Sequence, residues 1–142
     1  MRTRLIYVGV CLLLTAQLAN AKTTQHNPCA LFTTVEITTV LGTAVEGSEP
    51  AAMGTGCQWF GKDDKSYVII QQVGTEYWTD PKQASGYEAI QGVGKKAYSH
   101  PDVQGGWCAM ALTKDATASA LLIGTAKRAS AVTLLRQLLE RG

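Results

Sequence analysis

The chain has 142 residues, of which 46% are hydrophobic, 17% are charged and 7% are aromatic. Its formal net charge of +2 comes from Arg2 and Arg4, because residues 22–142 carry equal numbers of basic and acidic side chains. A neutral remainder lacks the strongly basic balance of proteins that hold nucleic acids or anionic membranes, so we expect no nucleic-acid partner.

The N-terminus has the three parts of a secretory signal peptide. Arg2 and Arg4 form a basic start, residues 5–14 are an uncharged apolar run, and residues 19–21 are a small-x-small cleavage site. An apolar run of ten residues falls short of the ~20 that a membrane-spanning helix needs. We therefore expect cleavage near Ala21, a periplasmic or secreted protein, and no stable membrane insertion.

The domain organisation follows from this signal. We expect residues 1–21 to be the signal peptide, residues 22–28 a flexible arm, and residues 29–142 a single α+β domain. A domain of this length buries a hydrophobic core without help. A branched residue stands before Cys11 where a lipid-anchored cysteine needs a small one, so we expect Cys11 to be lost with the signal peptide.

Three cysteines remain after cleavage, namely Cys29, Cys57 and Cys108. Thiols outside the cytoplasm tend to be oxidised, and an odd number allows one internal bridge at most and leaves one cysteine over. We favour Cys29–Cys57, which would pin the start of a helix to the head of a strand. A Cys57–Cys108 bridge between neighbouring strands is the alternative.

A metal site would need these cysteines together with His26 or His100. Zinc and copper sites usually show paired local ligands, and the sequence contains no C-x-x-C or H-x-x-x-H spacing. We therefore expect no metal and no cofactor.

The first predicted element is a short helix over Thr34–Leu41. Thr33 can cap its N-terminus, and Glu36, three residues on, completes a capping box. Gly42 suits the left-handed conformation that ends many helices. Residues 43–56 are rich in Gly, Ala, Ser and Glu and show no periodicity, which predicts a loop.

Two predicted hairpins supply most of the sheet. Residues 57–60 and 67–73 are rich in aromatic and β-branched side chains, and residues 107–113 and 118–124 form the second pair. A short strand over residues 95–98 precedes the second hairpin. Hairpin-linked strands predict an antiparallel sheet with the helices on one face. The expected fold is α+β with about five strands.

The remaining segments are two helices and a loop. Asp80-Pro81 predicts the start of a weak helix that runs to about Glu88. Residues 99–106 contain Pro101 and a glycine pair, which predicts an exposed loop. The last helix, residues 126–141, has apolar side chains at helical spacing. These apolar positions are Ala129, Val132, Leu135, Leu138 and Leu139.

Three blocks of sequence, residues 29–42, 56–59 and 92–98, together resemble a group of small exported bacterial proteins, many of them lipoproteins, classed as a domain of unknown function. Members share a Cys-Leu-x-Thr helix opening, a Gly-Cys-x-Trp strand and a Gly-Val-Gly turn. The resemblance covers essentially the whole mature chain, and its cysteine pattern implies the Cys29–Cys57 bridge. This chain departs from the pattern in having Cys108 and no lipid-anchor cysteine.

The sequence contains no catalytic signature, since acid–base chemistry needs a base and a nucleophile within reach. We therefore expect a monomeric, non-catalytic binding module of the cell envelope, with an unknown envelope protein or glycan as partner. Aromatic residues next to loops are favoured anchors, so the candidate partner-binding residues are Tyr77, Trp78, His100 and Trp107. The alternative is an inhibitor or immunity protein that inserts loop 99–106 into an envelope-acting enzyme.

Overall fold

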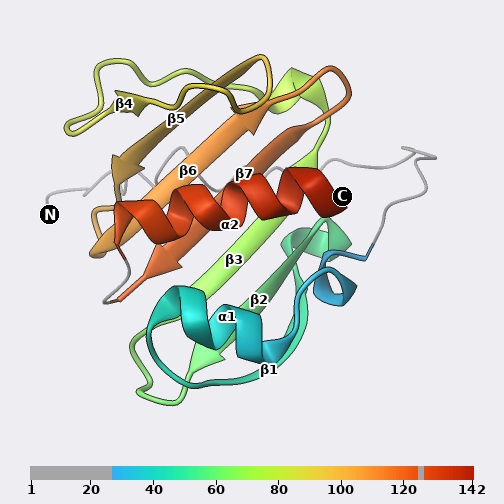
Figure 1. Cartoon of the computed structure of the whole chain (residues 1–142), viewed down its shortest axis with the longest axis vertical. Helices are drawn as coiled ribbons and strands as arrows, with labels where there is room; N and C mark the ends of the chain where they lie inside the picture. The colour runs from blue at the N-terminus through green and yellow to red at the C-terminus, as the bar shows by residue number, and fades with distance from the viewer. Residues whose placement is uncertain (1–26, 125–126) are drawn as a thin grey trace, which may run out of the picture.

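The computed structural model describes residues 27–124 and 127–142. The predicted signal peptide, Cys11 and His26 lie outside this part of the chain, as does most of the predicted arm. The described residues form one sheet with two α-helices in front of it (Figure 1). The helices are α1 (Thr34–Leu41) and α2 (Arg128–Arg141), with short 3-10 turns η1 (Pro28–Ala30), η2 (Ala52–Gly54) and η3 (Thr75–Tyr77). The strands are β1 (Val45–Ala51), β2 (Gly56–Gly61), β3 (Tyr67–Val73), β4 (Glu88–Ala89), β5 (Lys96–Pro101), β6 (Gly106–Leu112) and β7 (Thr117–Ile123).

The sheet has seven strands in the order β1-β2-β3-β7-β6-β5-β4, and every neighbouring pair is antiparallel. The first three strands and the last four each form a meander, and the two meet where β3 pairs with β7. The predicted α+β class and antiparallel sheet are confirmed, and both helices lie on one face (Figure 1). The expected number of about five strands is too low.

Two predictions about segments were wrong. The predicted loop 43–56 contains β1, an edge strand whose residues are mostly exposed. Only Val45 of β1 is buried, so the core covers neither face of the strand along most of its length, and β1 lacks the alternation that marks a half-buried strand. The predicted helix after Asp80 does not form, because the segment folds as successive turns. Gly86 there adopts a left-handed backbone (φ 73°), which interrupts a helix.

Helix α2 packs its leucines on small side chains of the sheet. The buried helix residues are Ala131, Leu134, Leu135 and Leu138, whereas Ala129 is exposed, so the buried stripe is rotated from the predicted one. The facing positions of β5, β6 and β7 are alanines, and they belong to the same core cluster. These alanines are Ala97, Ala109, Ala111, Ala118 and Ala120. Small residues on the sheet let the helix approach closely while its leucines fill the space.

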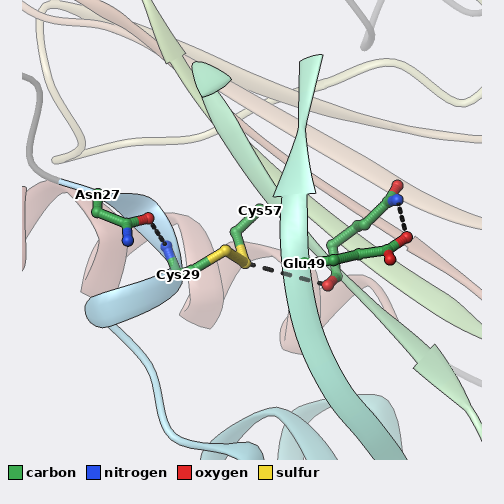
Figure 2. Close-up of a disulfide and its surroundings, with 5 residues drawn as sticks. Asn27, Cys29, Glu49 and Cys57 are labelled. Atoms are coloured by element: carbon green, nitrogen blue, oxygen red, sulfur yellow. Dashed lines mark hydrogen bonds between the residues drawn. A yellow bond between two sulfur atoms is a disulfide. The ribbon is translucent and has the colours of Figure 1, made fainter. Parts of the chain in front are cut away.

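The disulfide joins η1 to β2 (Figure 2). Cys29 is bonded to Cys57, which confirms the favoured pairing and excludes Cys57–Cys108. The Asn27 side chain accepts a hydrogen bond from the Cys29 amide at 3.0 Å and so caps η1. Cys108 is buried with Leu121 in a separate cluster and is not a free thiol either. The expectation of a left-over thiol was therefore wrong.

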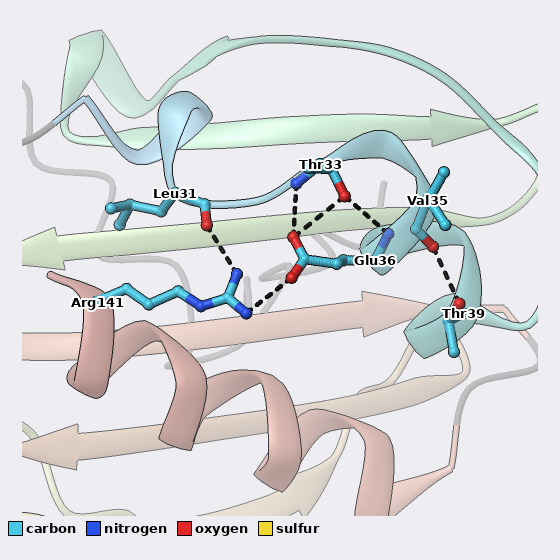
Figure 3. Close-up of polar contacts among 6 residues, drawn as sticks. All are labelled: Leu31, Thr33, Val35, Glu36, Thr39 and Arg141. Atoms are coloured by element: carbon cyan, nitrogen blue, oxygen red, sulfur yellow. Dashed lines mark hydrogen bonds and ion pairs between the residues drawn. The ribbon is translucent and has the colours of Figure 1, made fainter.

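The C-terminal end of α2 is fastened to the start of α1 (Figure 3). Arg141 donates hydrogen bonds to Glu36 Oε1 at 2.7 Å and to the Leu31 carbonyl at 2.8 Å. Its guanidinium also lies 4.7 Å from the centre of the Phe32 ring. Glu36 meanwhile accepts from the Thr33 amide at 2.8 Å, which completes the predicted capping box. One carboxylate thus serves both the helix cap and the ion pair.

Loss of the disulfide should destabilise the fold. Replacing Cys29 and Cys57 together by alanine removes a bridge across 28 residues. On the chain-entropy model this lowers the free energy of unfolding by about 3–4 kcal/mol. Urea unfolding measures the change. A double variant that unfolds at the wild-type midpoint would contradict a stabilising role for the bridge.

The Arg141–Glu36 pair should make stability depend on acid pH. The hydrogen bond from Arg141, followed by that from the Thr33 amide, lowers the pKa of Glu36 from 4.5 to about 2. The pair therefore stabilises the fold fully above pH 4.5, and this contribution is lost as the pH falls toward 2. Because both side chains are about one-third exposed, Arg141→Gln should cost only about 1 kcal/mol at pH 7.

Urea unfolding at pH 7 and at pH 2.5 gives this difference directly. Arg136→Gln, on the exposed side of the same helix, is the matched control and should change little at either pH. An equal loss in the two variants, or a loss in Arg141→Gln that does not shrink in acid, would show that the ion pair is not the cause.

Candidate functional site

The side chains on the two faces of β5 contact different parts of the structure. Ser99 accepts a hydrogen bond from Arg128 Nε of α2 at 2.8 Å, so Ser99 faces the helices. Successive side chains of a strand point to opposite faces, and Tyr98 and His100 therefore lie on the other face. No helix of the described residues covers this face, which we call the helix-free face (Figure 1).

A long connection crosses onto the helix-free face. Residues 74–87 join β3 to β4 with no regular structure except η3, and connections of this length are usually functional or disordered. We call the second part of this connection, residues 78–87, the strap. The rings of Trp78 and Tyr87 lie 5.4 and 5.2 Å from the ring of Tyr98, between ring centres. These contacts anchor the strap on β5.

Tyr98 is the centre of an aromatic cluster that consists of Trp78, Tyr87, Tyr98 and His100. Tyr98 has no exposed surface, and the His100 ring stacks on it at 6.0 Å. Trp78 and Tyr87 are half-buried, so the cluster reaches from the sheet to the molecular surface. Aromatic pairs in this range of distances add to the stability gained from burial.

The hydroxyls of the cluster are hydrogen-bond donors. Tyr87 donates to Asp80 Oδ1 at 2.8 Å, and Tyr98 donates to Met110 Sδ at 3.1 Å. Burial raises the pKa of both tyrosines, and the negative charge of Asp80 raises it further. Both hydroxyls therefore stay protonated at neutral pH, and Asp80 places a carboxylate next to the ring of Tyr87.

His100 carries an unpaired acceptor. Its Nδ1 lies 2.9 Å from the Pro101 carbonyl oxygen, and because a carbonyl only accepts, Nδ1 carries the proton. In the neutral ring, Nε2 is then an acceptor. Nε2 is buried and has no hydrogen-bond partner, in a side chain that is 6% exposed. Leaving such an atom unpaired costs about 1–3 kcal/mol.

Two further unpaired atoms lie elsewhere on the helix-free face. Gln71 of β3 donates to Thr55 Oγ1 at 3.0 Å, which leaves its Oε1 without a partner, and Thr117 Oγ1 of β7 also has none. Strands β7 and β6 separate Gln71 from His100. Three strand spacings amount to about 14 Å, so these atoms belong to a separate group.

The structure brings together two of the four residues predicted to contact a partner. Trp78 and His100 meet around Tyr98, whereas Tyr77 belongs to η3, outside the cluster. Trp107 of β6 pairs with Leu122 of β7 and packs against the core on the helix side. It therefore lies on the face opposite to the cluster.

Residues 99–106 do not form the predicted loop, because Ser99, His100 and Pro101 belong to β5. The observed turn is residues 102–105, in which Val103 is 83% exposed. His100 is therefore a buried strand residue, and the loop of the inhibitor hypothesis is a tight turn.

Sequence reasoning missed Tyr87 and Asp80 as site residues, and it did not place Tyr98 beside His100. Tyr98 and His100 are two residues apart, which is the spacing of one strand face, and this signal was hidden because the predicted strand ended at Tyr98. Nothing in the sequence indicated where Tyr87 lies, because the strap is irregular and its side chains show no periodic spacing.

Comparisons with family models, curated proteins and solved structures yield no match to this chain. The family resemblance therefore stays a prediction. Within residues 27–124 and 127–142, no group of three or more His, Cys, Asp or Glu side chains could hold a metal ion. None of the helices in this part of the chain is long and apolar enough to cross a membrane.

Tyr98 should be the residue on which the cluster depends. Tyr98→Ala removes a fully buried ring and should lower the free energy of unfolding by about 3–5 kcal/mol, whereas Tyr98→Phe keeps the ring and should cost about 1 kcal/mol. Urea unfolding separates the two effects. Tyr77→Ala, outside the cluster, is the control, and a comparable loss there would show that the cluster has no special role.

Proposed function

We propose that this protein is an exported, non-catalytic binding module of the bacterial cell envelope, and that the strap and the aromatic cluster form its contact surface. The observation that supports this proposal is the unpaired, buried acceptor of His100 beside two half-buried aromatic rings. Buried polar atoms in native proteins nearly always have partners. A ligand group that reaches Nε2 would provide one.

The composition of this surface suits binding. Tryptophan and tyrosine offer large contact areas at a low cost in conformational entropy, and they dominate binding energy at many interfaces. Trp78 and Tyr87 are carried by an irregular segment, where binding residues are common. The sheet beneath them is rigid, because β5 is paired with β6 along its whole length. A rigid support lowers the entropy lost on binding.

The surroundings of His100 favour binding over catalysis. A general base needs a nucleophile or a substrate proton within hydrogen-bond reach, and no side chain within the described part of the chain bonds to Nε2. Nδ1 is bound to the carbonyl of the next residue rather than to a carboxylate that would orient the ring. The arrangement therefore lacks the base–orienter pair typical of histidine catalysis.

The proposed location rests on the sequence and on the disulfide. The Cys29–Cys57 bridge fits an oxidising compartment, and the N-terminal pattern of basic start, apolar run and small-x-small site supplies the route of export. We propose a monomer that is free in the periplasm or secreted.

A capture experiment with matched tryptophan variants tests the proposed surface. Exported protein is immobilised and exposed to envelope proteins and to solubilised wall glycans, and the bound material is identified. We expect Trp78→Ala to reduce the recovery of a specific partner at least tenfold. Trp107→Phe, a substitution on the opposite face, should leave recovery unchanged.

The result separates the proposed functions. Equal recovery by wild type and Trp78→Ala, with both proteins folded, would refute the strap as contact surface. An envelope hydrolase as the captured partner, inhibited on binding, would favour the inhibitor alternative. Turnover of wall or peptide substrates by the purified protein would refute the non-catalytic assignment.

A further inference from the structure

The polar character of the cluster indicates which chemical class of ligand it takes. This inference rests on the proposed function. His100 Nε2 is a bare acceptor, and Asp80 adds a carboxylate whose Oδ1 accepts from Tyr87. The faces of aromatic rings are also negative, since their quadrupole attracts cations and N–H or O–H groups. All three features favour a hydrogen-bond donor and disfavour an anion.

Neither Lys96 of β5 nor Arg128 of α2 reaches His100. Lys96 lies on the same face of β5, but it is exposed and four residues from His100, or about 13 Å along an extended strand. Arg128 lies at the other face, where it pairs with Glu88 and Ser99. The acceptor of His100 therefore remains for an external donor.

The strap lies over Tyr98, next to the place that such a ligand would occupy. Its Gly86 backbone lies against the Pro101 ring, because a Cβ added at Gly86 would come within 2.6 Å of Pro101 Cδ. Because Glu88 of β4 pairs with Ser99 of β5 in antiparallel register, the end of the strap runs beside His100 and Pro101 at the edge of the sheet. The rings of Trp78 and Tyr87 anchor the strap on Tyr98, and the Tyr87–Asp80 hydrogen bond lies within the strap itself. These few contacts can open without disturbing the sheet.

We propose that the strap is a movable cover over a small-ligand site, and that the ligand donates an O–H or N–H hydrogen bond to His100 Nε2 while its body packs against Trp78 and Tyr87. A hydroxyl of a glycan and an ammonium group share this chemistry. A carboxylate or phosphate ligand brings negative charge and acceptor oxygens to a site that already offers an acceptor and a carboxylate, and the same chemistry therefore disfavours it.

Three probes of similar shape test the class of ligand. Benzyl alcohol is a neutral donor, benzylamine is a cationic donor, and benzoate has the same ring but only acceptor oxygens. The nitrogen-15 resonance of His100 Nε2 reports directly on the acceptor, and His26→Gln removes the other histidine signal of the mature chain. We expect benzyl alcohol or benzylamine to move this resonance upfield. Which of the two binds more tightly distinguishes a hydroxyl from an ammonium ligand.

His100→Phe is the decisive variant, because it keeps a ring that stacks on Tyr98 and removes the acceptor. Binding of the better probe, followed by Trp78 fluorescence, should weaken about fivefold to tenfold. Trp107→Phe is the control and should bind as the wild type does. Benzoate binding as tightly as the donors, an unmoved Nε2 resonance, or full binding by His100→Phe would each overturn the inference. Partner capture that depends on Trp78 but not on His100 would overturn the ligand class alone and leave the proposed function standing.

Discussion

The packing of α2 on alanines of β5, β6 and β7 is the interaction on which the rest of the structure depends. Leu134, Leu135 and Leu138 contribute the volume, and the small side chains of the sheet let the helix lie close. Because α1 joins α2 on the same face, neither helix can cover the other face (Figure 1). The strap therefore covers Tyr98 with two aromatic rings instead of a helix.

Two ties hold the N-terminal part of the domain onto this helix-covered sheet. Helix α1 has 8 residues and is too short to be stable by itself in water. The disulfide fixes the chain just before α1 to β2, and Arg141 binds the first turn of α1 to the last turn of α2. The same carboxylate, Glu36, caps α1 and receives Arg141. These two ties add to the apolar contacts that Ile37 and Leu41 of α1 make in the main core.

The sequence predicted features that depend on residues close together in the chain, and it did not predict contacts between distant segments. Thr33 and Glu36 predict the helix cap because both partners lie within one turn. Strand β1 was missed because only Val45 is buried in it, so its sequence shows no alternation. The segment after Asp80 was taken for a helix because Asp-Pro also begins turns, and the Ala84 amide bonds to the Pro81 carbonyl in such a turn. The cluster itself joins Trp78 to Tyr98 across the sheet, and no spacing predicts that contact.

The unpaired nitrogen of His100 is the observation that favours the proposed binding surface over a purely structural aromatic core. If the cluster served only to anchor the strap, phenylalanine at this position would stack on Tyr98 equally well and would bury no acceptor. The histidine instead costs about 1–3 kcal/mol, a sizeable part of the 5–15 kcal/mol that stabilises an ordinary domain. Its Nδ1 proton, held by the neighbouring carbonyl, keeps Nε2 an acceptor. A donor that reaches Nε2 recovers this free energy on binding, so the cost in the free protein becomes affinity in the complex.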